Sequence, residues 1–353
     1  SAFSHGAHPA IIFRWQGADV NTKPIRTLSA ALLLLTPTLR GEGYRFEIHP
    51  DPWHLAGFEN SLDLSAIASA APGRVLVGSD EMFHVQPGVM DAATHRIESR
   101  RPIALPVQAP GDKAEVDIEG IAWVPETSAY YVTGSHGVGK KKGDVQPDRL
   151  AIFRVPVNPE DGEIRGSGIE RASLETWIRG TKVLEPYLHV PLQKNGLNIE
   201  GLTSRDGRLF FGLRAPNIEG DGIVLEIPSE APFGSEKGSM TVHRVPVGEG
   251  RGIREIVAVR GGFILLTGNA SAEPSKKIPD TEAAEPDTRF ELLFWNGSGR
   301  KVSSIGTLPE NGGKAEGMLV LEDANDQIQL LVVFDSLLAG EPMAITVHRP
   351  EGS

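Results

Sequence analysis

Asp117-Ile118-Glu119-Gly120-Ile121-Ala122-Trp123 is the stretch that decides the fold, because the chain repeats it. Two further copies keep the Glu-Gly pair, at Asn198–Thr203 and Lys314–Leu319, and two degenerate copies lie at Asp63–Ala68 and Gly252–Val257. After each copy come a turn and a second apolar run that ends on a polar residue: Val75–Asp80, Tyr130–His136, Leu209–Arg214, Ile264–Asn269 and Leu330–Asp335. One supersecondary unit is therefore present five times.

Each unit has further apolar runs that predict a third and a fourth strand. In the first unit they are Thr94–Ser99 and Ile103–Val107, and in the second they are Leu150–Val157 and Leu188–Leu192. Four-stranded units of this size, arranged radially, form a β-propeller, so we predict an all-β chain with five blades. A six-bladed alternative would need another copy of the repeat within residues 1–57, and that stretch contains none.

The last unit has only three predicted strands before the chain ends. Tyr44–His49 alternates apolar and polar residues as a strand does. We expect this N-terminal strand to complete the last blade, because that pairing would join the two ends of the ring and remove an exposed edge.

Residues 1–40 do not fit the repeat. Lys23 and Arg26 precede the apolar run Leu28–Leu35, an order that resembles a secretory signal peptide, although a buried strand or short helix explains the run equally well. We therefore predict an N-terminal extension over residues 1–40 and a single propeller domain over residues 41–353. Apolar spacing after Ser173 predicts a helical insertion near residues 173–188.

The chain has 353 residues, a formal net charge of −11 and no cysteine. Nucleic acid and anionic membranes both need a basic surface, so neither is an expected partner, and no apolar run is long enough to span a bilayer. The lack of cysteine excludes thiolate-bound zinc and favours an exported bacterial protein, periplasmic or secreted, over a cytoplasmic one. No Walker A or dinucleotide fingerprint occurs, so no nucleotide cofactor is expected. The oligomeric state stays open.

In a propeller the first strand of each blade lines the central channel and the second runs back beside it. The start of the first strand and the end of the second therefore meet at one end of the channel, which we call the channel mouth. Side chains alternate along a strand, so motif positions one and three point the same way. The predicted mouth holds Asp63, Ser65, Asp117, Glu119, Asn198, Glu200, Gly252, Arg254, Lys314 and Glu316, with Asp80, His136, Arg214, Asn269 and Asp335 from the second strands.

The acidic residues at this mouth have three interpretations. Glu119, Glu200 and Glu316, with Asp63 and Asp117 nearby, are the oxygen ligands that calcium or magnesium prefers. Alternatively, Arg254, Lys314 and Arg214 neutralise the acids in a structural ring. The third interpretation is an acid–base pair that works without a metal.

Other residues at the mouth suit catalysis or binding. Glu119, Glu200 and His136 are the catalytic candidates, and His136 is either a ligand or general base or a plain rim residue. A small ligand, which an anionic group would suit, would be bound by Arg214, Arg254, Asn269, Asp335 and Asp80. Lys140–Lys142 are either a receptor for an anionic group or a solvated loop. No G-x-S-x-G occurs, so a serine hydrolase has little support.

The sequence resembles a family of bacterial proteins described as domain of unknown function 3616. The resemblance covers roughly residues 60–349 and rests on phrases that occur in order: Asp117–Ala122, Gly134–His136, Asn195–Leu202, Gly212–Pro216, Gly252–Glu255, Glu316–Gly317 and Val333–Ser336. It implies a β-propeller and no particular activity. The Glu-Gly phrase is also distantly similar to propellers named for an esterase-like activity of phytase. Ser65 and Arg254 depart from the acidic pattern and reduce the number of ligands for a cation.

Two functions remain open from the sequence. The first is a divalent-metal-assisted hydrolase of phosphate or other esters, with its site at the acidic channel mouth. The second is a non-catalytic propeller that binds a ligand or protein above a structural charged ring.

Overall fold

The computed structural model describes residues 39–40, 43–71, 73–109, 115–139, 142–158, 160–164, 166–234, 238–279 and 288–350. Contacts divide the chain after Leu35, and all of these residues belong to the second unit, Thr36–Ser353. The signal-like run Leu28–Leu35 lies outside the described residues. No described helix is long and apolar enough to cross a membrane.

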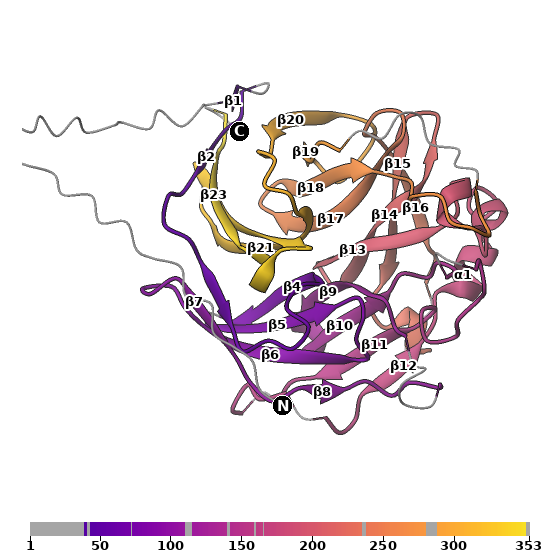
Figure 1. Ribbon diagram of the computed structural model, residues 1–353, viewed down its shortest axis with the longest axis horizontal. Helices are drawn as coiled ribbons and strands as arrows, with labels where there is room; N and C mark the ends of the chain where they lie inside the picture. The colour runs from indigo at the N-terminus through magenta and orange to yellow at the C-terminus, as the bar shows by residue number, and fades with distance from the viewer. Residues whose placement is uncertain are drawn as a thin grey trace, which may run out of the picture. The chain divides into compact units, whose positions relative to one another are not determined.

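The described residues form a five-bladed β-propeller (Figure 1). The five innermost strands contact one another in a closed ring, in the order β4, β9, β13, β17, β21 and back to β4. These strands are β4 (Leu64–Ala71), β9 (Ile118–Val124), β13 (Asn198–Arg205), β17 (Arg251–Val259) and β21 (Lys314–Asp323). They coincide with the five copies of the repeat, so the repeat encodes the ring.

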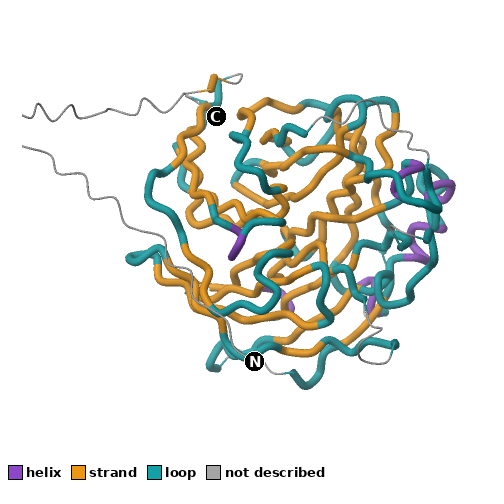
Figure 2. The backbone as a smooth tube through the Cα atoms, viewed as in Figure 1, coloured by secondary structure: helices purple, strands orange, loops and turns teal. Residues whose placement is uncertain are grey.

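The remaining strands complete each blade outwards from the channel (Figure 2). Blade 1 adds β5 (Arg74–Ser79), β6 (His84–Asp91) and β7 (Arg96–Ser99), with β3 (His54–Ala56) beside β7 and β8 (Ile103–Ala104) beside β6. Blade 2 adds β10 (Ala129–Gly134), β11 (Ile152–Pro156) and β12 (Glu170–Ala172). Blade 3 adds β14 (Arg208–Ile218), β15 (Asp221–Pro228) and β16 (Thr241–Pro246). Blade 4 adds β18 (Gly262–Asn269), β19 (Glu291–Trp295) and β20 (Val302–Thr307).

Blade 5 is built from both ends of the propeller. Its C-terminal strands are β22 (Gln327–Asp335) and β23 (Met343–His348), and β23 pairs with β2 (Arg45–Ile48) from the N-terminal side. The short strand β1 (Leu39–Arg40) pairs with β2 at the outer edge. The expected closure by an N-terminal strand is confirmed, and it leaves β23 with a partner along each edge.

The apolar core is divided among the blades. Five clusters of buried side chains each lie between two neighbouring blades, so every blade packs on the next. The second strands are apolar on both faces for this reason: Leu209–Leu213 in blade 3 is fully or almost fully buried throughout. Burial on two faces explains why these runs are continuous rather than alternating.

The predicted third strand of blade 2, Leu150–Val157, is confirmed as β11, but the outer strands of blade 1 and the fourth strand of blade 2 were assigned wrongly. Thr94–Ser99 overlaps the fourth strand β7, and the third strand is β6, whose Pro87 and Gly88 hide its strand pattern. Leu188–Leu192 is not a strand. The fourth strand of blade 2 is instead the short β12. The insertion itself holds the helix α1 (Glu175–Arg179) and the 3₁₀ turns Glu185–Tyr187 and Leu192–Lys194. Further 3₁₀ turns lie at Pro125–Thr127, Ala231–Phe233 and Leu338–Gly340.

Candidate functional site

The third motif position has the same backbone geometry in all five blades. In each inner strand this residue has no partner in the register with the second strand, so it is the extra residue of a β-bulge. In blade 3, Ile199 pairs with Leu213 and Gly201 with Gly212, and Glu200 between them is skipped. The equivalent skipped residues are Ser65, Glu119, Arg254 and Glu316. A bulge redirects a side chain, and here it does so at the same place five times.

Glycine at the fourth motif position leaves room for a close approach between blades. A Cβ on Gly201 would lie 2.8 Å from the backbone nitrogen of Ile256 and 2.9 Å from Cα of Glu255. A Cβ on Gly120 would lie 2.6 Å from Cβ of Leu202. The Glu-Gly pair therefore combines a redirected polar side chain with tight packing of neighbouring inner strands.

A charged network joins three blades at the channel mouth; we define it as Glu200, Arg214, Arg254 and Glu316. Nε of Arg254 lies 2.8 Å from Oε2 of Glu200, and Nη2 of Arg254 donates to Glu316. Nη1 of Arg214 donates to Oε1 of Glu200 over 2.9 Å. Arg214 and Arg254 thus both contact Glu200, and Arg254 also contacts Glu316 in the next blade.

Because Arg254 is buried, its guanidinium needs its ionic partners to stay charged. Its desolvation disfavours the charged form, but the carboxylates of Glu200 and Glu316, together with Glu119 and Asp335, outweigh that effect and raise the pKa of Arg254. A buried guanidinium without such partners would be costly. Arg254 is therefore the cation that Glu200 and Glu316 share.

For Glu316, in contrast, desolvation outweighs the attraction of its ionic partner. Burial raises its pKa to about 7, Arg254 opposes the rise, and the neighbouring carboxylates of Glu200 and Asp335 add to it. Its side chain keeps 12% of its surface exposed. Glu316 is thus a partly accessible carboxyl at the mouth that exchanges its proton near neutral pH.

The other predicted mouth residues fall into separate pairs. Asp117 accepts from Nη1 of Arg149 over 2.6 Å, and the pKa of Arg149, which desolvation lowers, is raised by Asp117, Glu115 and Glu119. Lys314 donates to Asp335 over 2.6 Å. The carbonyl of Asn269 accepts from Arg214, and Ser65 donates to the carbonyl of Ile118 over 2.5 Å.

Asp63 and Asp80 lie together at the blade 1 side of the mouth, where the backbone nitrogen of Asp80 donates to the carbonyl of Asp63 over 3.3 Å. Both side chains are half-buried. The predicted members of the mouth are thus brought to one end of the channel, but as pairs and a network rather than as one cluster. No group of three or more His, Asp or Glu side chains in the described part of the chain is arranged to hold a metal ion.

His136 is fully buried rather than exposed on the rim of the mouth. Its Nδ1 lies 3.1 Å from the carbonyl of Gly134, and Nε2 accepts from the backbone nitrogen of Leu174 over 3.2 Å. Burial lowers its pKa to about 4, so it is neutral at physiological pH. With both ring nitrogens bonded to the backbone, His136 fixes the start of the helical insertion, a structural role in place of the predicted general base or ligand. Lys140 and Lys141 lie outside the described residues.

Two important residues were not among the site predictions. Arg149 lies between the second and third strands of blade 2, where the repeat gives no signal. Glu255 occupies the position that is glycine in three other blades, and its buried carboxyl accepts from the backbone nitrogens of Ile256 over 2.8 Å and Leu202 over 3.2 Å. Desolvation raises the pKa of Glu255 well above its ordinary value, although Met318 also donates a backbone hydrogen bond. The replacement of glycine by Glu255 at this motif position was the one sequence signal for this contact between blades 3 and 4.

A search of curated proteins finds no match. Among solved structures, a tail fiber of Staphylococcus aureus phage P68 is 9% identical with a TM-score of 0.42, covering 86% of this chain and 53% of the other. A streptogramin B lyase is 10% identical with a TM-score of 0.37, covering 86% and 98%. U3-55K is 8% identical with a TM-score of 0.35, covering 83% and 65%, so this chain spans less than two thirds of that protein.

These likenesses are too remote to bear on chemistry. The family comparison is more specific, because its model matches residues 63–154 and 167–341, more than half of the chain and all five inner strands. The matched segments include the five bulged positions and the charged network. The chain therefore belongs to the family described as protein of unknown function (DUF3616).

Proposed function

We propose that the protein is a binding propeller whose channel mouth holds a small polar ligand above a structural charged network. The observation that carries this proposal is the position of Arg254, which contacts Glu200 and Glu316 at once. A divalent cation between those carboxylates would have to displace the arginine. Removing one partner from a buried ion pair costs roughly 3–5 kcal/mol, so the displacement is unfavourable.

Two acceptors among the predicted mouth residues, in Asn198 and Glu316, suit recognition of hydrogen-bond donors. Oδ1 of Asn198 is buried and has no hydrogen-bond partner among the described residues. The carboxyl of Glu316 is partly exposed, while Lys314 lies open to solvent, 59% exposed, beside Asp335. Because buried acceptors are normally satisfied, we expect a ligand with hydroxyl or amine groups. Sugars, polyols and alkylamines are suitable probes.

Substitution of the network separates a structural role from a catalytic one. Glu200→Gln leaves both Arg254 and Arg214 with one charged partner fewer, so we expect its unfolding free energy to fall by about 3 kcal/mol. Glu310→Gln, an exposed carboxylate outside the network, is the matched control and should change little. A Glu200→Gln variant as stable as the wild type would contradict the structural role.

The ligand site has its own test. Thermal shift with glucose, glycerol and ethanolamine should identify a probe that raises the melting temperature of the wild type, since a ligand that binds only the native state stabilises it. The same probe should give a smaller shift with Asn198→Ala. Equal shifts in the two proteins would place the binding elsewhere.

Metal-assisted ester hydrolysis remains the second candidate, and the burial of Glu316 favours it: desolvation raises the pKa of this carboxyl to about 7, which suits general acid–base catalysis. Hydrolysis of p-nitrophenyl acetate and p-nitrophenyl phosphate with added calcium or magnesium is the measurement. This candidate predicts turnover that Glu316→Gln abolishes while the thermal transition stays nearly unchanged. Turnover no faster than that of a heat-inactivated sample would rule out this candidate.

A further inference from the structure

A second cavity lies on the outer side of the propeller, away from the channel mouth. It has a volume of 1090 Å³ and is formed between blade 1 and the loop that follows β11 in blade 2. On the blade 1 side, β8 pairs with β6 only at His84 and Val85, and on the blade 2 side β12 pairs with β11 only up to Arg154. The outer strands of both blades are short at this place.

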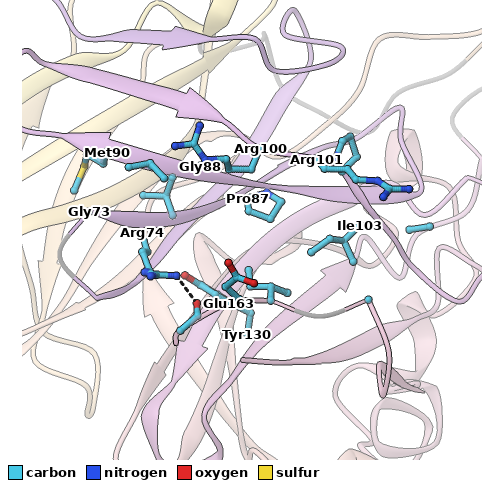
Figure 3. A pocket seen from close by; sticks show the side chains of 17 residues that line it. Gly73, Arg74, Pro87, Gly88, Met90, Arg100, Arg101, Ile103, Tyr130 and Glu163 are labelled. Carbon is cyan, nitrogen blue, oxygen red and sulfur yellow. Dashed lines mark hydrogen bonds between the residues drawn. The ribbon is translucent and has the colours of Figure 1, made fainter. Parts of the chain in front are cut away.

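Three arginines surround this cavity. Arg74 lies on one side and Arg100 and Arg101 on the other, as Figure 3 shows. Glu163 is the one acidic side chain among the described residues that line it. The local charge is therefore positive, although the chain as a whole carries −11.

The three arginines differ from most others in the protein because none forms an ion pair with a carboxylate among the described residues. Arg74 donates to the carbonyl of Gly162 over 2.9 Å, and the contact of Arg100 is to the carbonyl of Ser99 over 3.5 Å. Arg96, only a few residues away on β7, pairs with Glu98 at 2.9 Å. Guanidinium groups that keep free donors around one cavity are suited to bind a carboxylate or phosphate.

Apolar side chains also line the cavity. Pro87, Val89 and Met90 come from β6, Ile103 from β8 and Ile164 from the blade 2 loop. Val89 is 40% exposed, which is unusual for a valine on a central strand of a blade. Ligand sites commonly combine an apolar lining with a few polar groups that fix orientation.

We propose that this outer cavity binds an amphipathic anion, a small molecule with a carboxylate head and an aliphatic body. The head accepts hydrogen bonds from the guanidinium groups, and the aliphatic body covers Val89, Ile103 and Ile164. The site is separate from the channel mouth, so it does not depend on the function proposed there.

Titration calorimetry with octanoate, octylamine and inorganic phosphate tests the proposal on the whole chain. Octanoate should bind saturably, and the affinity should fall as ionic strength rises, because exposed charges are screened. Octylamine shares the aliphatic body but has a cationic head, and phosphate has the charge without the body, so both should bind at least ~10-fold more weakly.

Variants locate the site. Combined Arg100→Ala and Arg101→Ala substitution should weaken octanoate binding about 10-fold or more, and Val89→Asp should do the same by placing a like charge in the apolar lining. Arg96→Ala is the matched control, because it removes a neighbouring arginine that is already paired. All of these residues are exposed, so the melting temperature should be retained.

Several outcomes would overturn the proposal. They are equal affinity for octanoate and octylamine, unchanged affinity in the Arg100 and Arg101 variant, and phosphate binding as tight as octanoate binding. An acidic peptide that binds where octanoate does not would replace the small molecule with a protein partner.

Discussion

Glu316 shows how one buried carboxyl makes stability depend on pH. Its pKa in the folded protein is about 7, against 4.5 for the unperturbed group, chiefly because of desolvation. Between those two values the folded state retains a proton that the unfolded state has released. The stabilising contribution of this proton is complete below pH 4.5 and is lost as pH rises through about 7.

Glu316→Gln should remove this dependence, because glutamine imitates the protonated carboxyl. We expect the wild-type melting temperature to decline relative to that of the variant as pH rises from about 4.5 to about 7. Other groups titrate in both proteins, so the difference between the two curves isolates Glu316. Parallel curves would show that its pKa in the folded state is near the ordinary value.

At the scale of elements, the Glu-Gly pair makes a prediction about glycine. Gly201→Ala would place a methyl group 2.8 Å from the backbone of Ile256, where nothing flexible can yield. Overpacking of this kind costs roughly 1–3 kcal/mol. Gly180→Ala is the control, because its nearest neighbours would be at 3.5 Å, an ordinary contact. Chemical denaturation compares the two variants, and equal stability would mean that the inner strands can move apart.

The closing strand makes a second prediction at this scale. Strand β2 contributes four pairs to β23, the buried side chain of Phe46, and the neighbouring Tyr44, whose ring stacks on Phe294 at 5.4 Å. Deleting residues 1–49 should lower the melting temperature strongly and promote association, because the edge of β23 becomes unpaired. Deleting residues 1–42 leaves β2 in place and is the control. Similar melting curves for both deletions would contradict a closing role.

The elements differ in how far the sequence reveals them. The inner strands were predicted correctly because a motif repeated five times is a strong signal, and the closing strand because Tyr44–His49 alternates apolar and polar residues. The outer strands of blade 1 and the fourth strand of blade 2 were not, since short apolar runs such as Leu188–Leu192 fit a turn or a strand equally well. Bulges need a paired strand to be recognised, so the register at Glu119 and Glu200 could not be read in advance.

The ionic partner of a mouth residue could be predicted only where the residue and its partner both lie at repeated positions. Arg254 and Arg214 were named as neutralising groups because they occupy repeated positions, and the structure pairs them with Glu200. Arg149 could not be found, since it lies in the connection between β10 and β11, outside the repeated motif. The role of His136 depended on a contact with Leu174, which comes from an insertion outside the repeat.

For the whole molecule, five similar blades carry an unequal distribution of charge. The charged network spans blades 3, 4 and 5, while in blade 1 the equivalent position is Ser65, which makes a neutral hydrogen bond to blade 2. The backbone therefore keeps the symmetry of the repeat and the side chains at the mouth do not. One side of the mouth is fixed by ion pairs, and Glu316 and Lys314 at its edge remain accessible.

Arg254 contacts both Glu200 and Glu316, and we propose that it supplies the positive charge that a metal ion would otherwise provide. This proposal is tested by following the melting temperature during calcium titration, starting from an EDTA-treated sample, in the wild type and in Arg254→Met. We predict no shift for the wild type and a saturable rise for the variant, whose carboxylates have lost their cation. A saturable rise in the wild type that EDTA reverses would contradict the account.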